Sequence, residues 1–297
     1  MATLRKSQFD LATGKVWRQQ TLADQIGVSP RQIEAIEQGA KSYLEPDILA
    51  KLANVFRLTT LERREFFALA AGVTAEALML QPLAPAAILT PLLATLGVLQ
   101  QPAYLHDGFF NIIALNSPMR AFFGIDQAYL TQLKDQAGAN YLYALFAPAS
   151  PLRTVLQHYW QPTARRAVAR FRAFSLRYRP TDYFSQLFHQ LCALPDFTAL
   201  WQQTQQETDD LYSHVQVDEY CHPRWGEVRY LLTRTTTVTT YGNLYLVTLA
   251  PANANTLAAF ATPATDQEVV EPLSPWPNPC LSSAGEFASE SGWEIVA

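Results

Sequence analysis

The sequence predicts two folds in tandem, an all-α head followed by an α+β domain in which an antiparallel sheet is flanked by helices. Apolar residues recur at intervals of three and four between Gln19 and Gly72, which indicates a run of short helices. Aromatic and β-branched segments near Ala103 and after residue 212 indicate strands, with proline-bounded helical segments between them. At 297 residues the chain is long enough for two hydrophobic cores.

These patterns divide the chain into four segments. We assign residues 1–72 to the head, 73–102 to a linker with a connecting helix, 103–261 to the α+β domain and 262–297 to a Pro/Ser-rich tail. The head carries a net charge of +2, residues 73–263 are neutral overall, and residues 264–297 carry −6, within a total of −4. A weakly basic head beside a neutral body is typical of a nucleic-acid module joined to a binding module.

Several classes of protein are disfavoured by the residues that carry chemistry. The three cysteines are widely spaced and the five histidines are scattered, so we expect no disulfide framework and no metal site. No nucleophile elbow, phosphate loop or dinucleotide fingerprint is present, so we expect no enzyme. The N-terminus lacks the apolar core of a signal peptide, and no apolar run reaches the ~20 residues that span a bilayer. We expect a cytoplasmic protein with no membrane partner.

In the head, the stretch ADQIGVSPRQIEAIEQG predicts two helices joined by a tight turn, after a first helix within residues 2–13. The helix before the turn should run from about Arg18 to Ile26, and Gly27 supplies the positive φ of the turn. Ser29 caps the next helix and Pro30 takes its first position. The same pattern occurs in αα-corners that bind nothing, so it does not by itself establish a DNA-binding function.

Beyond the head, the connecting helix is expected between proline breaks within residues 80–97. Asp107-Gly108 favours a tight hairpin turn, and Ser117-Pro118 predicts a helix with serine as its N-cap. Residues 150–212 should be helical, and the arginine-rich run RRAVARFRAFSLRYR within them is typical of a solvated helix face. Three strands follow, with a turn at Tyr241-Gly242-Asn243, and the tail from about Thr262 has the composition of a flexible arm.

A series of apolar, glycine and capping residues between Leu22 and Leu58 follows the order found in one family of DNA-binding domains. In order they are Leu22-Ala23, Gly27-Val28-Ser29, Ile33, Ile36-Glu37, Gly39, Leu49, Leu52-Ala53 and Leu58. The head therefore resembles the DNA-binding domain of XRE-type (λ-repressor/Cro-like) regulators. Pro30 departs from the basic or polar residue that this family often has after the serine, and Trp17-Arg18 replaces its usual Leu-Thr cap.

The resemblance implies which side chains of the head meet double-stranded DNA. Gln19 would contact the backbone and support the base-reading residues, which lie on the outer face of the helix after the turn. Arg31 and Gln32 are the expected base readers, for guanine and adenine, and Glu34 could accept a hydrogen bond from a cytosine amino group. The remaining expected contacts are Ala35 on the same outer face and Arg18, Lys41 and Lys15 at phosphates.

The body resembles the MmyB-like C-terminal domain that some XRE-type regulators carry. TTLERREFFALAAG has the Leu-x-x-x-Glu-Arg helix of that group. The motifs of the body follow in order, through Asn116, Phe123 and Gly124, through Asn140, Leu142 and Phe146, through PDFTALWQQ, and through His222, Pro223 and Gly226. The resemblance implies a PAS-like domain with an apolar cavity and a fatty acid or acyl-like molecule as effector. Candidate partners of a ligand carboxylate are Asn116, Asn140, Arg172 and His222.

Together the two resemblances imply a sequence-specific transcription regulator that responds to a small apolar ligand. A head of only +2 should bind DNA weakly by itself, so we expect a homodimer with two heads on half-sites about one helical turn (~34 Å) apart. The alternative is an interaction protein whose helix-turn-helix contacts a protein partner and whose body binds no small molecule.

Overall fold

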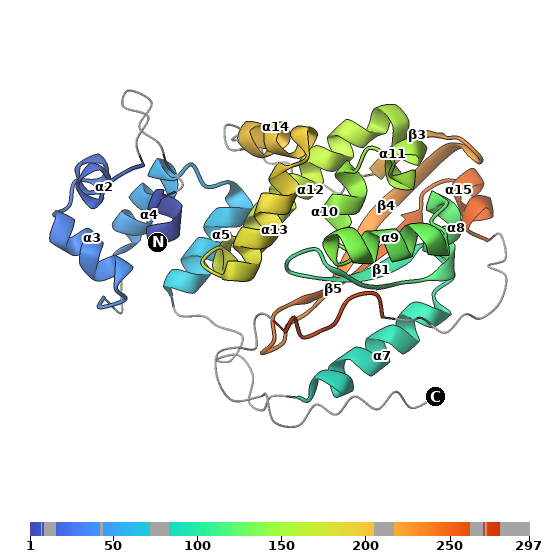
Figure 1. Ribbon diagram of the computed structural model, residues 1–297, viewed down its shortest axis with the longest axis horizontal. Coiled ribbons are helices and arrows are strands. Elements are labelled where there is room, and N and C mark those ends of the chain that lie inside the picture. The colour runs from blue at the N-terminus through green and yellow to red at the C-terminus, as the bar shows by residue number, and fades with distance from the viewer. Residues whose placement is uncertain are drawn as a thin grey trace.

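The structure is a computed structural model that describes residues 1–6, 8, 16–41, 44–71, 83–204, 217–261, 270 and 272–279. A helical head lies at one end of an elongated molecule and an α+β body at the other (Figure 1). The helices of the head are α1 (Ala2–Lys6), α2 (Gln19–Ile26), α3 (Pro30–Glu37), α4 (Pro46–Val55) and α5 (Thr60–Ala70). The predicted combination of an all-α head and an α+β body is confirmed.

The turn between α2 and α3 forms as the sequence predicts. Gly27 has a φ of 74°, in the left-handed region that glycine adopts at low cost. The Ser29 side chain accepts the Gln32 amide, and the Gln32 side chain accepts the Ser29 amide at 2.9 Å, so the two residues form a capping box. Leu22 and Ile33 are fully buried between the helices, which fixes the angle at which α3 leaves the turn.

The body is built on one five-stranded antiparallel sheet in the order β2-β1-β5-β4-β3. The strands are β1 (Ala103–Asp107), β2 (Ile112–Leu115), β3 (Val217–His222), β4 (Gly226–Thr237) and β5 (Leu244–Pro251). Successive side chains point to opposite faces of a strand, so Tyr104 joins the large core on one face while Leu105 joins a second cluster on the other.

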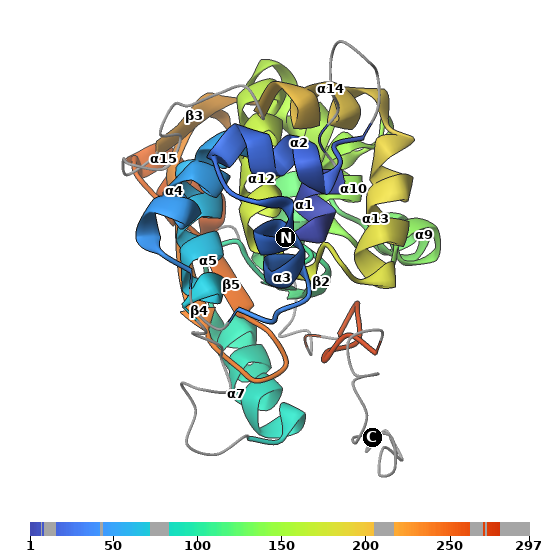
Figure 2. The ribbon, with the colours of Figure 1, turned by 90° about the vertical axis from the view of Figure 1, so that its left-hand side faces the viewer.

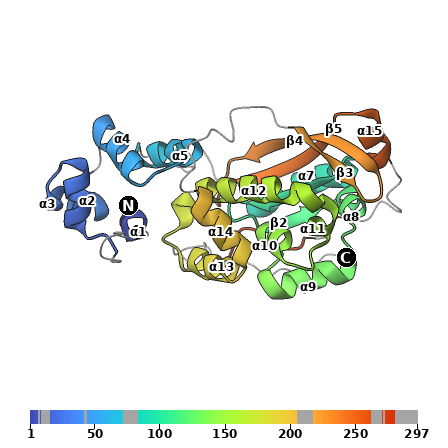
Figure 3. The same cartoon turned by 90° about the horizontal axis from the view of Figure 1, so that it is seen from above.

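Helices cover the two faces of the sheet unequally. On the face of the large core lie α8 (Ser117–Phe123), α9 (Gln127–Ala137), α10 (Tyr141–Phe146), α11 (Pro151–Leu156), η1 (Gln157–Tyr159), α12 (Trp160–Phe174), η2 (Leu176–Tyr178), α13 (Asp182–Cys192), α14 (Pro195–Thr204) and α15 (Ala254–Phe260). The connecting helix α7 (Pro85–Val98) lies against the opposite face, where Ile88 and Leu96 pack on Leu105 and Leu244 (Figures 1 and 3).

Of two local predictions in the body, one is confirmed and one is wrong. The chain turns tightly between β1 and β2, because the Phe110 amide donates to the Asp107 carbonyl at 3.1 Å and the Asp107 carboxylate accepts the amides of Phe109 and Asn111 at 2.8 and 2.9 Å. The positive φ falls on Phe110 rather than on Gly108. The N-cap of α8 is Asn116, not Ser117, because the Asn116 side chain accepts the Met119 amide.

Residues 272–279 of the acidic tail also lie against the body. Leu273 donates its amide to the Ile113 carbonyl at 2.7 Å, and Ser274 donates its hydroxyl to the Gly138 carbonyl at 2.6 Å. Trp276 is buried in the cluster beneath α7. The expectation of a flexible arm therefore does not apply to residues 272–279, and the tail beyond residue 279 lies outside the described residues.

The segment after α12 joins the two cores. Leu176 of η2 is 7% exposed and packs in the core of the head with Phe66. Two residues later, Tyr178 lies against the turns of the body, where a Cβ at Gly108 would come within 3.1 Å of its ring. Residues of η2 therefore contact both the head and the body.

We predict that Asn116→Ala lowers the free energy of unfolding by about 2–3 kcal/mol, because it removes an N-cap and leaves buried backbone groups unpaired. The Asn116 amide group donates to the carbonyls of Leu99 and Gln101, and its oxygen also accepts from Ala103. Urea unfolding followed by circular dichroism measures the change. Gln203→Ala, at an exposed position of α14, is the control and should shift stability by less than about 0.5 kcal/mol. An Asn116→Ala variant as stable as this control would contradict the prediction.

Candidate functional site

The outer face of α3 lies at the end of the molecule farthest from the body. In Figure 2 the head is turned toward the viewer, with α2 and α3 in front of the body. Arg31 and Glu34 are exposed on α3, whereas Ala35 is half-buried. Arg18 and Lys41 are exposed at the start of α2 and after α3. Lys15 lies outside the described residues.

Two of the predicted DNA contacts already have partners within the head. The Gln32 side chain belongs to the capping box, so its amide oxygen is engaged at the start of α3. Gln19 donates to Glu37 at 2.8 Å, and Glu37 also binds Arg5 of α1 at 2.8 and 3.0 Å. Burial acts to raise the pKa of Glu37, but the hydrogen bonds from Arg5 and Gln19 outweigh it and lower that pKa. Gln19 therefore fixes the far end of α3 through an ionised carboxylate.

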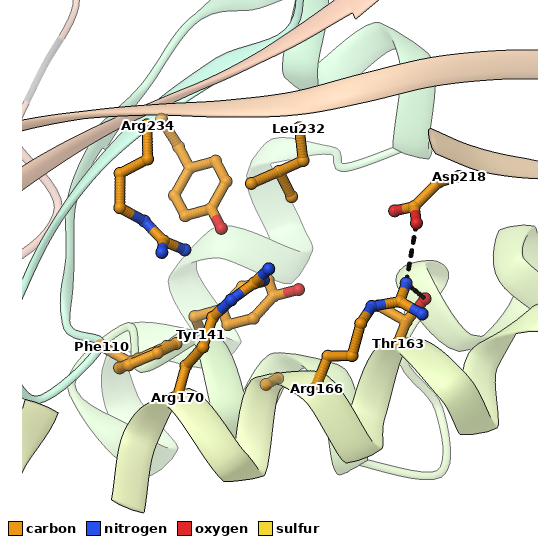
Figure 4. A pocket seen from close by; sticks show the side chains of 10 residues that line it. Phe110, Tyr141, Thr163, Arg166, Arg170, Asp218, Leu232 and Arg234 are labelled. Carbon is orange, nitrogen blue, oxygen red and sulfur yellow. Dashed lines mark hydrogen bonds and ion pairs between the residues drawn. The ribbon is translucent and has the colours of Figure 1, made fainter. Parts of the chain in front are cut away.

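The body contains a cavity between α12 and the sheet, with a volume of about 30 Å³. One water needs about 10–15 Å³ of such space, so the cavity holds about two waters as it stands. Its walls come from β1, β3, β4, α10, α12 and the loop after β1 (Figure 4). The lining residues are Tyr104, Phe110, Tyr141, Thr163, Arg166, Ala167, Arg170, Asp218, Leu232 and Arg234.

Positive charge dominates this lining. Arg166 donates to Asp218 at 2.8 Å, and the Tyr159 hydroxyl donates to the same oxygen at 2.8 Å. Arg170 of α12 and Arg234 of β4 point toward each other across the cavity (Figure 4). Burial first, and then the nearby charge of Arg170, lowers the pKa of the Arg234 guanidinium. Its Nε is buried without a hydrogen-bond partner among the described residues. The cavity is thus suited to an anion.

A second cavity of about 20 Å³ adjoins the first and is entirely apolar. It is lined by Tyr104, Ile112, Leu115, Met119, Ile125, Tyr129, Leu130, Leu133, Tyr141, Ala144 and Leu152. Tyr104 and Tyr141 line both cavities and stack with their ring centroids 5.5 Å apart. This tyrosine pair separates the cationic cavity from the apolar one.

The four side chains predicted to hold a ligand carboxylate lie outside both linings. Asn116 caps α8, and Asn140 caps α10 while donating to Phe109 and Asn111. His222 contacts the Phe122 carbonyl through Nε2 at 2.8 Å and accepts the amides of Arg224 and Trp225 at Nδ1. Arg172 points to the head. Ligand contacts from these residues stay a prediction, and they would require each side chain to leave these hydrogen bonds.

Arg172 instead takes part in a buried cluster that joins the head to the body. Glu62 of α5 is fully buried, and its carboxylate lies 3.1 Å from Arg172 and 2.8 Å from Arg179. Both guanidinium groups lie over the ring of Trp201, at 4.6 and 5.5 Å from its centroid. We call Glu62, Arg172, Arg179 and Trp201 the interdomain cluster. The expectation that the arginine-rich run forms a solvated face is wrong for Arg166 and Arg172, which are buried.

Glu62 also starts its own helix. Its carboxylate accepts the Thr59 amide at 2.9 Å, and its amide donates to the Thr59 hydroxyl, which completes a capping box at α5. Burial acts to raise the pKa of Glu62, but Arg172, Arg179 and the Thr59 amide outweigh it and lower that pKa below its ordinary value. The cluster is therefore held by an ionised carboxylate with two cations.

Sequence reasoning missed Glu62, Arg170 and Arg234 as functional candidates. The spacing Thr59-x-x-Glu62 is a capping-box signature, but nothing in it shows that the carboxylate meets another domain. Arg166 and Arg170 are four residues apart and share one helix face, which could have been found. Arg234 could have been placed on the inner face of its strand by alternation, but not opposite Arg170.

A helix-turn-helix with an exposed second helix, joined to a domain with an internal cavity, is the organisation of a DNA-binding regulator with a ligand-binding domain. The comparisons with known proteins agree. Residues 86–262 match the family of the MmyB-like transcription regulator ligand binding domain, and residues 17–63 match a helix-turn-helix family. The chain belongs to the MmyB-like transcription regulators, with an XRE-type helix-turn-helix at its N-terminus. No individual curated protein matches it with significant similarity.

The match also bears on the other classes considered. The matched families are a helix-turn-helix family and the ligand-binding domain of a transcription regulator. Among the described residues, no three His, Cys, Asp or Glu side chains gather where they could hold a metal ion. No helix in the described ranges is both long and apolar enough to cross a membrane.

We predict that Glu62→Gln destabilises the protein by about 3–5 kcal/mol at neutral pH, because it leaves two buried guanidinium groups without a countercharge. Thermal and urea unfolding of the full chain measure the loss. The matched control is Glu65→Gln, three residues further along α5, whose partner Arg64 is exposed. It should change stability by less than about 0.5 kcal/mol.

The difference between wild type and Glu62→Gln should depend on pH. A carboxyl whose pKa is lowered by folding contributes stability above its ordinary pKa of 4.5 and loses that contribution as the pH falls through the lowered value. The gap between the two proteins should therefore be constant near neutrality and narrow in acid. A gap that widens in acid, or a variant as stable as Glu65→Gln, would show that Glu62 is not ionised in the cluster.

Proposed function

We propose that this protein binds a specific DNA sequence through α3 and that an acyl-like anion in the body, such as a fatty acid, changes its affinity for that sequence. The observation that carries the proposal is the position of α12. This one helix presents Arg166 and Arg170 to the cavity and, half a turn further on, Arg172 to Glu62 of the head.

The head supports specific DNA binding through few but well-fixed groups. Arg31 is exposed near the positive N-terminal end of α3, where a helix in the major groove would present it to a guanine edge. The capping box and the Gln19–Glu37 contact hold the two ends of α3. Arg18 and Lys41 are exposed on either side and suit phosphate contacts, which add affinity but no sequence information.

The cavities support an amphipathic ligand in a PAS-like domain. A head group would bind at Arg170 and Arg234, and an apolar chain would extend past Tyr104 and Tyr141 into the apolar cavity. Each buried methylene adds about 0.8 kcal/mol to the affinity. With volumes of about 30 and 20 Å³ the cavities must widen to admit such a chain, so ligand entry requires the tyrosine pair to separate.

The separation of the tyrosine pair connects ligand binding to the position of the DNA-binding head. Tyr141 begins α10, and α10 packs against α12, so separating the tyrosine pair displaces a neighbour of α12. Arg172 cannot follow such a displacement without changing its contact with Glu62, because both side chains are buried in a fixed arrangement. A ligand that favours one position of α12 then favours one position of the head.

A homodimer completes the proposal. One head with a net charge of +2 neutralises few phosphates, so specific binding at physiological salt needs a second head on the adjacent half-site. Sedimentation of the protein with and without a palindromic site measures this state.

We predict that Arg31→Ala reduces the preference for the specific site about tenfold to a hundredfold, because it removes a bidentate base contact worth about 1–3 kcal/mol. The site comes from selection of random DNA by the wild-type protein, and gel shifts compare it with a scrambled duplex. Lys51→Ala, which removes one exposed charge from α4, should retain the preference. Gln32→Glu keeps the capping box, so it tests adenine recognition without disturbing α3. A preference retained in Arg31→Ala and in Gln32→Glu would refute the assignment of α3.

We predict that dodecanoate raises the Tm of the full chain by about 5–10 °C at a hundredfold excess over its Kd, because it binds only the folded state. Ala144→Leu narrows the apolar cavity and should abolish the shift. Ala199→Leu, which adds the same volume at an exposed position of α14, should retain it. The absence of a shift with any saturated fatty acid, together with a bare mass in native mass spectrometry, would refute an acyl ligand.

A further inference from the structure

We infer that Tyr178 of η2 transmits the state of the cationic cavity to the DNA-binding head, through the loop of residues 108–111 between β1 and β2. The inference rests on the proposed function, because it names a positioning residue for the same response to a ligand. It adds a second connection to the contact between Arg172 and Glu62. It follows from the contacts of the loop with the cavity on one side and with η2 on the other.

The loop forms part of the cavity wall. Phe110 is buried, lines the cationic cavity and packs edge-to-face on Phe171 of α12, with ring centroids 5.8 Å apart (Figure 4). Its φ is 66°, in the left-handed region that a bulky side chain adopts only at a cost in energy. Strained residues of this kind persist where surrounding contacts hold them, and they are typical of switch regions. A ligand that widens the cavity therefore acts on a wall residue whose displacement releases strain.

The loop moves as a unit because one carboxylate holds both neighbours of Phe110. Asp107 accepts the amides of Phe109 and Asn111 at 2.8 and 2.9 Å, and the Asn111 side chain donates to its second oxygen at 2.9 Å. The Tyr183 hydroxyl donates to the Asn111 side-chain oxygen at 3.0 Å. Displacing Phe110 from the cavity wall therefore also displaces Phe109.

Phe109 contacts η2 directly. The ring centroids of Phe109 and Tyr178 are 4.7 Å apart. Tyr178 is also enclosed by the turns at both sides, since a Cβ at Gly108 would come within 3.1 Å of its ring and a Cβ at Gly242 within 2.9 Å of its hydroxyl. No space remains there for an additional methyl group, so Tyr178 follows any displacement of Phe109.

Tyr178 shares its short helix with a residue of the head core. Leu176 lies two residues earlier in η2 and is buried in the same core as Ile33 of α3. The two ends of one three-residue helix are thus inserted into different domains. A shift of Tyr178 in the body is passed to Leu176, and through the core of the head to the helix that is proposed to read DNA.

The test compares the affinity of the full chain for its selected DNA site with and without saturating dodecanoate. We expect dodecanoate to change the wild-type affinity by about five- to hundredfold, the usual range of coupling between two sites. Tyr178→Leu should reduce this change to less than about twofold and leave the Kd for dodecanoate within about threefold, because Tyr178 lies outside both cavity linings. Tyr178→Phe keeps the ring and should retain the full change.

Two further variants separate transmission from a general loss of packing. Trp225→Leu removes a half-buried ring outside both linings and outside the core of the head, so it should retain the response. Phe109→Leu should lose the response by itself. Combined with Tyr178→Leu it should lose no more than either variant alone, because both interrupt one contact.

Gly108→Ala tests the same connection without a ligand. Gly108 has no positive φ, so the backbone accepts alanine and the added methyl group presses on the ring of Tyr178. The DNA affinity of the ligand-free protein should move by at least about threefold toward the liganded value. Gly97→Ala adds the same methyl group on α7, at an ordinary 3.5 Å from Val270, and should leave the affinity unchanged.

The outcomes separate the inference from the proposed function. A full response in Tyr178→Leu would overturn the role of Tyr178 and leave a ligand-responsive regulator in place. A wild-type affinity for DNA that does not change with dodecanoate would overturn both. Circular dichroism and Tm show whether each variant is folded. If Tyr178→Leu does not fold, a full response in Phe109→Leu together with an unchanged ligand-free affinity in Gly108→Ala would overturn the inference.

Discussion

The arrangement of this protein depends on one buried carboxylate. Glu62 is excluded from water, so its charge is tolerable only while Arg172 and Arg179 remain beside it, and both arginines belong to the other domain. The same carboxylate caps α5, so the start of a head helix and the contact between domains cannot be changed independently. A mobile joint between the domains would expose these charges in turn, and the cluster therefore favours a defined orientation of the head.

The helix α12 gives this orientation a connection to the interior of the body. Its successive turns face the cationic cavity, the interdomain cluster and the aromatic stack of Phe174 on Tyr245, whose centroids lie 4.7 Å apart. The helix that forms one wall of the cationic cavity therefore also carries Arg172, which contacts Glu62 of the head. Small cavities beside a packed helix suit a response with two states, since close-packed interiors rearrange in steps rather than by gradual deformation.

Much of the fold could be predicted because local chemistry determines it. The turn at Gly27, the cap at Ser29 and the antiparallel strands follow from short-range preferences that the tertiary structure does not override. The functional sites were harder to predict from the sequence than the fold. Asn116, Asn140 and His222 stand out as polar residues in motifs, yet each satisfies nearby backbone groups. No sequence motif marks Arg170 and Arg234 as a pair, and only the packing of α12 on the sheet brings them together. Sequence spacing reveals which face a side chain occupies but not which distant residue it meets.

The insertion of Leu176 into the core of the head bears on how such regulators can be taken apart and recombined. A head cut from the chain after residue 72 would lack one of its own buried side chains and would expose Phe66 to water. The folding unit of the head is thus discontinuous, since it borrows η2 from a point more than a hundred residues away. A chimera that joins this head to a different sensor would have to transplant η2 with it, and evolutionary shuffling of the two domains faces the same requirement.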